Sequence, residues 1–217
     1  FLDCFGVDLQ GIYGTTETGG ISTTYGAATP AGSVGRPMGP VRLSIGNQNA
    51  YADLGPGVGE VFIHSPSMME GYVGCDTRWG QDGAFGTGDL GRVDTCGNLT
   101  LVGRIKDMIN LGGMKVDPAP VEQALLQHVT VTDAAVYPGI RPDGSEFVQA
   151  CITLADGHHL SERDLKVHCT HLLDAFRVPT RFHVKDVLPR TASGKCLKVK
   201  CPQFPASLRT DGSSPAD

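Results

Sequence analysis

The spacing of apolar residues changes near residue 104, and this change constrains the fold more than any other feature of the sequence. Between residues 31 and 103, short apolar stretches alternate with turns rich in Gly, Pro and Asp. This pattern predicts several short strands in a small sheet or barrel. Further along, helical and strand-like spacings follow one another, so a second body of a different kind is predicted. Three of the apolar stretches are 41–45, 59–64 and 98–102.

The second body is expected to be a compact α+β domain whose elements follow the order αββαβ. One helix is expected to begin at Pro118, because proline suits the first turn of a helix. Another is expected to begin after Ser161, because serine is a good N-cap. Strands are expected at 133–140, 147–155 and 182–187.

The predicted fold class is therefore α+β, with a small β-barrel-like subdomain followed by a compact α+β C-terminal domain. The first body covers 1–103, and a hinge is expected at 104–107. The second body covers 108–203, and a tail rich in Ser, Pro and Asp at 204–217 is expected to be disordered. The run 11–20 is rich in Gly and Thr, so it is expected to form a loop rather than a regular element.

Composition and charge exclude several classes of function. The net charge of −5 argues against nucleic acid as the main partner. No apolar run approaches the roughly 20 residues that a membrane-spanning helix requires, and the first residues do not resemble a signal peptide. The seven cysteines include no C-x-x-C pair, which argues against a zinc or redox site and favours the reducing cytoplasm.

Several polar residues lie in glycine-rich surroundings, and each has an ordinary explanation as well as a functional one. Tyr13 offers a flat face for a base, although a single tyrosine more often serves packing. Thr16 and Glu17 pair a hydroxyl with a carboxylate, which can hold a phosphate oxygen and Mg²⁺ or can simply form a turn. Asp89 can accept from both hydroxyls of a ribose or can cap a loop.

Two cations belong to the same group of candidates. Arg104 has a planar donor fork that suits ribose or phosphate, and its alternative is a surface ion pair. Lys195 follows Gly194 in a Ser-Gly-Lys turn and can reach an anion, although a solvated lysine would look the same. Cations outnumber acids between Arg177 and Lys200, and this local reversal of charge would steer phosphates toward the segment.

The order and spacing of these segments resemble the AMP-forming acyl/aryl-CoA synthetases and the wider adenylating superfamily, which includes luciferases and the adenylation domains of peptide synthetases. The similarity runs from residue 10 to residue 200, and the segments 59–61 and 70–72 also match. It implies an ATP-dependent carboxylate–CoA ligase, which forms an acyl- or aryl-adenylate with release of pyrophosphate and then a thioester with CoA.

For the nucleotide, the resemblance implies five roles. Tyr13 would stack on adenine, and Thr16 would bind the α-phosphate. Asp89 would bind both ribose hydroxyls, with help from Arg104. Glu17 would hold Mg²⁺.

For the chemistry and the domain movement, the resemblance implies five more roles. Lys195 would be the catalytic residue, because it would bridge the acyl carboxylate and the α-phosphate. Asp107 would be the hinge about which the C-terminal domain rotates. Gly112 and Gly113 would line the pantetheine tunnel, with Lys106 close by.

The resemblance also implies cofactors and partners. These are ATP, Mg²⁺, CoA or the phosphopantetheine of a carrier protein, and a small carboxylic acid. The family's phosphate loop and most of its acyl pocket precede the tyrosine segment, so residues 1–103 resemble the end of a large N-terminal domain. The missing half would belong to the same polypeptide or to a separate chain, and the chain alone is expected to be inactive.

Two alternatives stay open at this point. The first is an adenylating enzyme that loads a carrier-protein thiol instead of CoA, although the run 109–118 looks more like the CoA-ligase branch. The second is a non-catalytic module that keeps the family fold. The retained charges of Glu17, Asp89, Arg104 and Lys195 argue against the second alternative, since a scaffold requires none of them.

Overall fold

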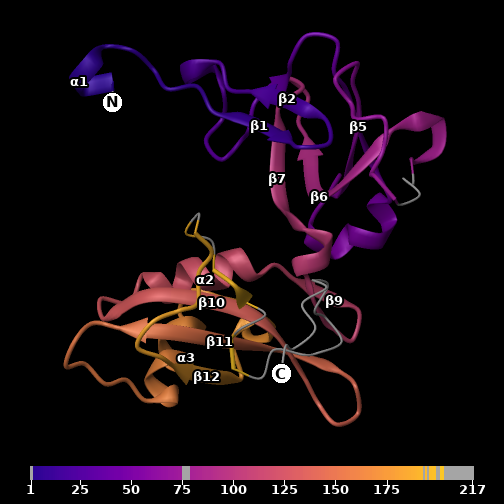
Figure 1. Ribbon diagram of the computed structural model, residues 1–217. Coiled ribbons are helices and arrows are strands. Elements are labelled where there is room, and N and C mark those ends of the chain that lie inside the picture. The colour runs from indigo at the N-terminus through magenta and orange to yellow at the C-terminus, as the bar shows by residue number, and fades with distance from the viewer. Residues whose placement is uncertain (1, 75–78, 193, 195, 199–200, 203–217) are drawn as a thin grey trace. The chain divides into compact units, whose positions relative to one another are not determined.

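The chain folds into two compact units. The computed structural model describes residues 2–74, 79–192, 194, 196–198 and 201–202. The units are Phe1–Lys106 and Asp107–Asp217 (Figure 1). The boundary between them lies within the stretch where the hinge is predicted, and the hinge role of Asp107 stays a prediction.

The first unit begins with a three-stranded antiparallel sheet. Its strands are β1 (Ile12–Thr15), β2 (Gly19–Thr23) and β3 (Arg36–Pro37), in that order. The expectation of a loop at 11–20 is therefore wrong, because most of this run forms the β1–β2 hairpin. Glycine permits the pairing, since a Cβ atom on Gly14 would lie 2.5 Å from the carbonyl oxygen of Gly19.

A four-stranded antiparallel sheet completes the first unit. Its strands are β4 (Arg42–Gly46), β5 (Gly59–His64), β6 (Phe85–Val93) and β7 (Leu99–Arg104), in that order. Three of these strands match the predicted stretches. The expected barrel does not close in the described part of the chain. Strand β4 pairs only with β5, and β7 meets the first sheet only through an isolated bridge.

Gly35 is the residue through which the two sheets meet. It forms an isolated bridge with Leu99, and the Leu99 N–H donates to its carbonyl at 2.8 Å. The φ angle of Gly35 is +82°, and a Cβ atom there would overlap the carbonyl oxygen of Thr23. Only glycine therefore allows the chain to pass this close to strand β2 at the position where it also bonds to β7. The shared core includes the fully buried residues Ile21, Val61, Ile63 and Leu99.

The second unit contains the predicted order of elements. Helix α2 (Pro118–Leu126) precedes β10 (Val131–Ile140) and β11 (Glu146–Leu154), and α3 (Glu162–Thr170) precedes β12 (Arg181–Val184). Strands β10 and β11 are antiparallel, whereas β11 and β12 are parallel. This confirms the α+β prediction. A short hairpin of β8 (Ile109–Leu111) and β9 (Met114–Val116) precedes α2.

Local capping explains where the two helices begin. The Asp117 side chain accepts the N–H of Ala119 and caps α2, whose first residue is Pro118. Ser161 caps α3 through a reciprocal pair of contacts with Asp164. Such caps bind N–H groups that have no hydrogen-bond partner within the helix. Because the capping residues are neighbours in the chain, the caps can be predicted from the local sequence.

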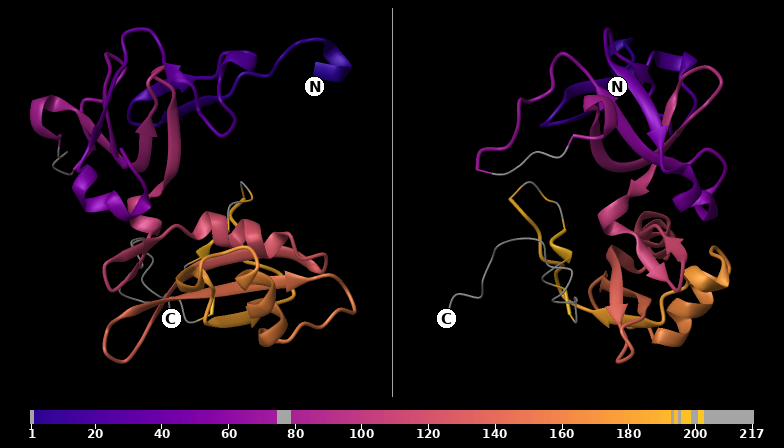
Figure 2. Two further views of the ribbon diagram at one scale, coloured as in Figure 1. Left: turned by 180° about the vertical axis from the view of Figure 1, so that it is seen from behind. Right: turned by 90° about the vertical axis from the view of Figure 1, so that its right-hand side faces the viewer.

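The sheet of the second unit is covered on both faces. Alternate residues of β10 point to opposite sides, so that Val136 packs with residues of the helices, whereas Tyr137 packs with Leu188 and Cys201 of the chain that returns after β12. Figure 2 shows this yellow segment on the side of the sheet away from α2 and α3.

The remaining helices are short. None of the helices within the described ranges is long and apolar enough to cross a membrane. These short helices are α1 (Leu2–Phe5) and the single 3-10 turns or turn pairs at Gly26–Ala28, Gln48–Leu54, Gln81–Gly83, Ile105–Asp107 and Ala175–Arg177.

Candidate active site

The turn between β1 and β2 presents a hydroxyl and a carboxylate side by side. The N–H of Thr18 donates to the carbonyl of Thr15 at 3.4 Å and to its hydroxyl at 3.2 Å. The hydroxyls of these two threonines also lie 3.0 Å apart. The turn is therefore held from within, which leaves Thr16 exposed and Glu17 half-buried at its tip.

A tyrosine from a distant part of the chain contacts Glu17. The hydroxyl of Tyr72 donates to Glu17 Oε1 at 2.8 Å, and the N–H of Met69 donates to the Glu17 carbonyl at 2.8 Å. The Tyr72 bond lowers the pKa of the Glu17 carboxyl. Glu17 is therefore ionised at neutral pH, which is the form that can ligate Mg²⁺. No role for Tyr72 follows from the sequence beyond its place in a matching segment.

Replacement of Tyr72 by phenylalanine is expected to raise the pKa of Glu17 toward the ordinary glutamate value. The reason is that the hydroxyl stabilises the ionised carboxylate, and phenylalanine has no donor. An NMR titration of the Glu17 carboxyl carbon measures the change. Tyr51→Phe is the control, because Tyr51 lines the same cavity and its own pKa is raised by burial and then by the charge of Glu60. An unchanged Glu17 titration in Tyr72→Phe would contradict the contact.

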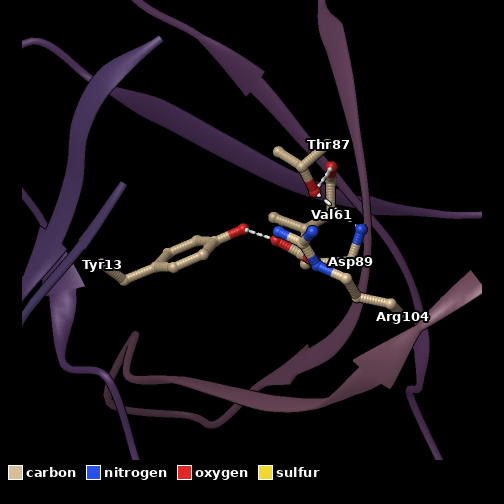
Figure 3. A network of polar contacts seen from close by, with 5 residues as sticks. All are labelled: Tyr13, Val61, Thr87, Asp89 and Arg104. Carbon is tan, nitrogen blue, oxygen red and sulfur yellow. Dashed lines mark hydrogen bonds and ion pairs between the residues drawn. The ribbon is translucent and has the colours of Figure 1, made fainter. Parts of the chain in front are cut away.

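Asp89 is the centre of a second group of contacts (Figure 3). The Tyr13 hydroxyl donates to Asp89 Oδ2 at 2.6 Å, and Arg104 Nε donates to Asp89 Oδ1 at 2.6 Å. Asp89 is only 3% exposed, so a buried carboxylate has a donor on each oxygen. Burial, and then the bond to Asp89, raise the pKa of Tyr13, which keeps its hydroxyl protonated as a donor.

A bulge in β6 orients the Asp89 side chain toward Tyr13 and Arg104. Glu60 pairs with Leu90 and Phe62 pairs with Gly86, so β6 holds more residues than β5 over the same interval. Gly88 has a φ angle of +70° within this bulge. The Thr87 hydroxyl bridges the irregularity, because it donates to the Val61 carbonyl at 3.0 Å and accepts the Asp89 N–H at 3.1 Å (Figure 3).

These groups border one open cavity of about 890 Å³ within the first unit. Its volume is in the range of ligand-binding pockets. Thr16, Glu17, Arg104 and Lys106 line it, as does Tyr72. The buried Asp89 and the half-buried Tyr13 contribute through their contacts with Arg104 and with each other. The structure thus brings together six of the residues that the sequence singled out.

Three other predicted residues belong to the second unit or its boundary. Gly112 and Gly113 form the exposed turn of the β8–β9 hairpin, with φ angles of +64° and +109°. The N–H of Gly113 donates to Asn110 Oδ1 at 2.8 Å, which closes the turn. Asp107 is exposed at the start of the unit. The tunnel and hinge roles of these residues stay predictions.

Lys195 lies outside the described residues, but described residues on either side of it contact one another. Arg190 and Cys196 are joined by an antiparallel bridge, and the N–H of Gly194 donates to the Thr191 carbonyl at 2.9 Å. The Arg190 guanidinium contacts both the Gly194 carbonyl and the carboxylate of Asp133 in β10. The base of this loop is therefore tied to the sheet.

A hydroxyl, carboxylates and a guanidinium around a space of this size are typical of a nucleotide-binding protein. Comparison with protein families makes this class specific. The AMP-binding enzyme model matches residues 1–73, and the model of the AMP-binding enzyme C-terminal domain matches residues 120–195. The chain belongs to the adenylate-forming AMP-binding enzymes.

Individual relatives agree with this assignment. The chain is 34% identical over 206 residues to "Oxalate--CoA ligase" of Arabidopsis thaliana, a match that covers 89% of this chain and 39% of that protein. It is 35% identical to "Fatty acid--[acyl-carrier-protein] ligase ScoC" of Streptomyces coeruleorubidus, with 91% and 39% covered. The chain thus spans about two-fifths of the length of these curated relatives.

A solved structure has the same fold. It is the o-succinylbenzoate CoA synthetase (MenE) of Bacillus subtilis in complex with its acyl-adenylate intermediate. The TM-score is 0.77 and the sequence identity 29%, and the match covers 92% of this chain and 42% of that one. The same enzyme is also known in complex with ATP and a magnesium ion.

Proposed function

We propose that the chain is the nucleotide-binding portion of an ATP-dependent carboxylate–CoA ligase. The observation that carries the proposal is the cavity that joins Thr16 and Glu17 to Arg104, with the buried Asp89 beside it. The names of several relatives support the reaction class, since they are CoA ligases. The acid that the whole protein activates would be selected by residues outside this chain.

In the first half-reaction, a carboxylate attacks the α-phosphate of ATP, and pyrophosphate leaves. Thr16 would donate its hydroxyl to an α-phosphate oxygen, and Asp89 would accept the two ribose hydroxyls. Tyr13 would lie against the adenine base. Lys195 would stabilise the charge that develops between the two anions, and one such donor typically contributes about 10²–10³ in rate.

The residues at the hairpin tip also suit a magnesium ion. The Glu17 carboxylate and the Thr16 hydroxyl are hard oxygen ligands, and Mg²⁺ usually takes few ligands from the protein and more from phosphates and water. Bound there, the ion would neutralise charge on the phosphates of ATP. The lowered pKa of Glu17 supports this role, because the carboxylate is already ionised.

In the second half-reaction, a thiol attacks the adenylate, and AMP leaves. We propose CoA as the acceptor, with Gly112, Gly113 and Lys106 beside its pantetheine arm after rotation about Asp107. The absence of side chains at the two glycines suits close passage of a slim arm. The name of ScoC keeps a carrier-protein thiol as the second candidate.

The test begins with the native protein, isolated from its source with its associated chains. Its intact mass shows whether this sequence is part of a longer polypeptide or is bound to a second chain. An ATP–pyrophosphate exchange assay with a panel of carboxylic acids then measures adenylation. We expect acid-dependent exchange by the native protein and negligible exchange by the 217-residue chain alone. A native protein that shows no exchange with any acid would favour the non-catalytic alternative.

The acceptor is tested separately. Once an acid is identified, CoA and a phosphopantetheinylated carrier protein are compared in the thioester-forming step. Faster transfer to CoA supports the proposed ligase, and transfer only to the carrier protein would replace it.

A further inference from the structure

Three thiols gather on the sheet face of the second unit that the returning chain covers. Cys151 belongs to β11, whereas Cys196 and Cys201 belong to the segment that packs over it. Cys151 is fully buried, Cys201 is 4% exposed and Cys196 is partly exposed. None of these thiols has a role in the proposed ligase reaction. Cysteines thus form half of this small cluster, whose other members are Ala135, Tyr137 and Leu188.

Cys201 is the centre of the group. Its thiol donates to the Leu197 carbonyl oxygen at 4.0 Å and lies within hydrogen-bonding reach of the Cys151 and Cys196 thiols. All three cysteines are present as free thiols. The Cys201 sulfur therefore packs in one cluster with the two thiols with which it could form a disulfide.

The surroundings favour reaction at Cys196. The contact with Cys201 lowers the pKa of the Cys196 thiol, and Lys198 and Arg190 lower it further, whereas burial and the charge of Asp133 oppose them without reversing the shift. Cys196 is also the most exposed of the three. Cys169 in the other core offers a contrast, because burial raises its pKa to about 11.

We propose that Cys151, Cys196 and Cys201 form a site of reversible oxidation by small hydroperoxides, in which Cys196 reacts first and then forms a disulfide with Cys201. This inference does not depend on the ligase reaction. The lack of a C-x-x-C pair in the sequence does not exclude this site. The cluster brings together Cys151 in β11 and cysteines more than forty positions later in the chain.

The chemistry balances in two steps. The Cys196 thiolate attacks the terminal oxygen of a hydroperoxide, the O–O bond breaks, and the other oxygen leaves as an alcohol or water after taking up a proton. Cys196 is thereby oxidised to a sulfenic acid. The Cys201 sulfur then attacks the Cys196 sulfur, the S–O bond breaks, and water leaves. The two thiols lose two electrons and the hydroperoxide gains them, and a dithiol reductant reverses the change.

The product would be a covalent brace beside the loop that contains Lys195. Cys196 already closes that loop through its bridge with Arg190. A bond to the buried Cys201 would anchor the same end of the loop to the core of the unit.

Peptide mapping of the peroxide-treated chain tests the proposal. The chain is treated with a limiting amount of hydrogen peroxide, free thiols are blocked, and a non-reducing tryptic digest is analysed by mass spectrometry. Trypsin cuts after Lys198 and Lys200, so the peptides of Cys196 and Cys201 separate unless a disulfide joins them. We expect the joined peptide as the first product, and we expect dithiothreitol to abolish it.

Two cysteines in the same digest are internal controls. Cys96 is exposed but lies outside the cluster, and Cys169 is buried outside it. We expect Cys196 to react at least tenfold faster than either. In Cys201→Ser, the sulfenic acid of Cys196 has lost its partner thiol, so labelling by dimedone should increase.

Several results would overturn the proposal. One is a Cys196 that oxidises no faster than Cys96. Another is a Cys196 that proceeds to sulfinic acid under limiting peroxide without the joined peptide. A disulfide between Cys201 and Cys151 as the first product would contradict the assignment of Cys196 as the reactive thiol.

Discussion

Asp89→Asn in the native protein is expected to weaken AMP binding by about ten- to a hundredfold. The carboxylate would accept two ribose hydroxyls, and a hydrogen bond to a charged group contributes about 1.5–3 kcal/mol. Asparagine has the same shape but only one accepting oxygen and no charge. The substitution also removes the negative charge that pairs with Arg104, and it changes the carboxylate that accepts the Tyr13 hydroxyl. Isothermal titration calorimetry with AMP measures the affinity.

A matched control lies in the turn between β6 and β7. Asp94 is exposed, and its Oδ1 accepts the N–H groups of Cys96 and Asn98. Asparagine at this position keeps that oxygen and loses only the bond that Oδ2 accepts from Asn98 Nδ2 at 2.9 Å. Asp94→Asn therefore removes one negative charge near the same strands without touching the Asp89 contacts. We expect AMP affinity within twofold of the unaltered protein. Unchanged affinity in Asp89→Asn, in a protein that stays folded, would remove the ribose role from Asp89.

Gly35→Ala is expected to produce the largest loss of stability in the first unit. The left-handed conformation of Gly35 costs alanine about 1–2 kcal/mol. Overlap of the new Cβ with the Thr23 carbonyl adds about 1–3 kcal/mol, because the chain at Gly35 must move away from strand β2 to relieve it. The protein contains a single tryptophan, Trp79, which packs edge-to-face on Phe85 in the first unit. Its fluorescence in a urea titration therefore reports the unfolding of this unit.

Gly32→Ala separates the two causes. Gly32 has a nearly identical φ angle of +79°, but a Cβ atom there meets no other atom within 4 Å. We expect it to lose only the conformational part, about 1–2 kcal/mol. Equal losses in the two variants would show that the close approach of Gly35 to the Thr23 carbonyl adds no cost to the substitution, contrary to the structure.

The sequence predicts best those parts of the fold whose signals are local. The start of α2 at Pro118 and the cap of α3 at Ser161 depend on neighbouring residues, and both are confirmed. Strand β5 coincides with the predicted 59–64. The β1–β2 hairpin was missed because its glycines look like a loop in the sequence. What makes them strands is the approach of a second backbone, as at Gly14.

The candidate site shows the same division between local and distant signals. The sequence identifies Thr16, Glu17 and Arg104, and the structure places them around one cavity. Tyr72 could not be assigned, because a hydroxyl that meets a carboxylate 55 positions away leaves no local pattern. Asp89 was selected, but its burial and its bulge depend on the pairing of β6 with β5.

The cavity is assembled from contacts between residues far apart in the chain, and this sets the order in which it can form. Tyr13 and Asp89 are 76 positions apart, and the hairpin that carries Tyr13 is synthesised well before β6. Contacts of such separation arise late in folding, because a long loop must close before they are gained. The β1–β2 hairpin therefore lacks its contacts with Tyr72 and Asp89 until the rest of the first unit has been synthesised. Acquisition of nucleotide affinity during refolding should coincide with completion of the first unit, and not with any earlier step.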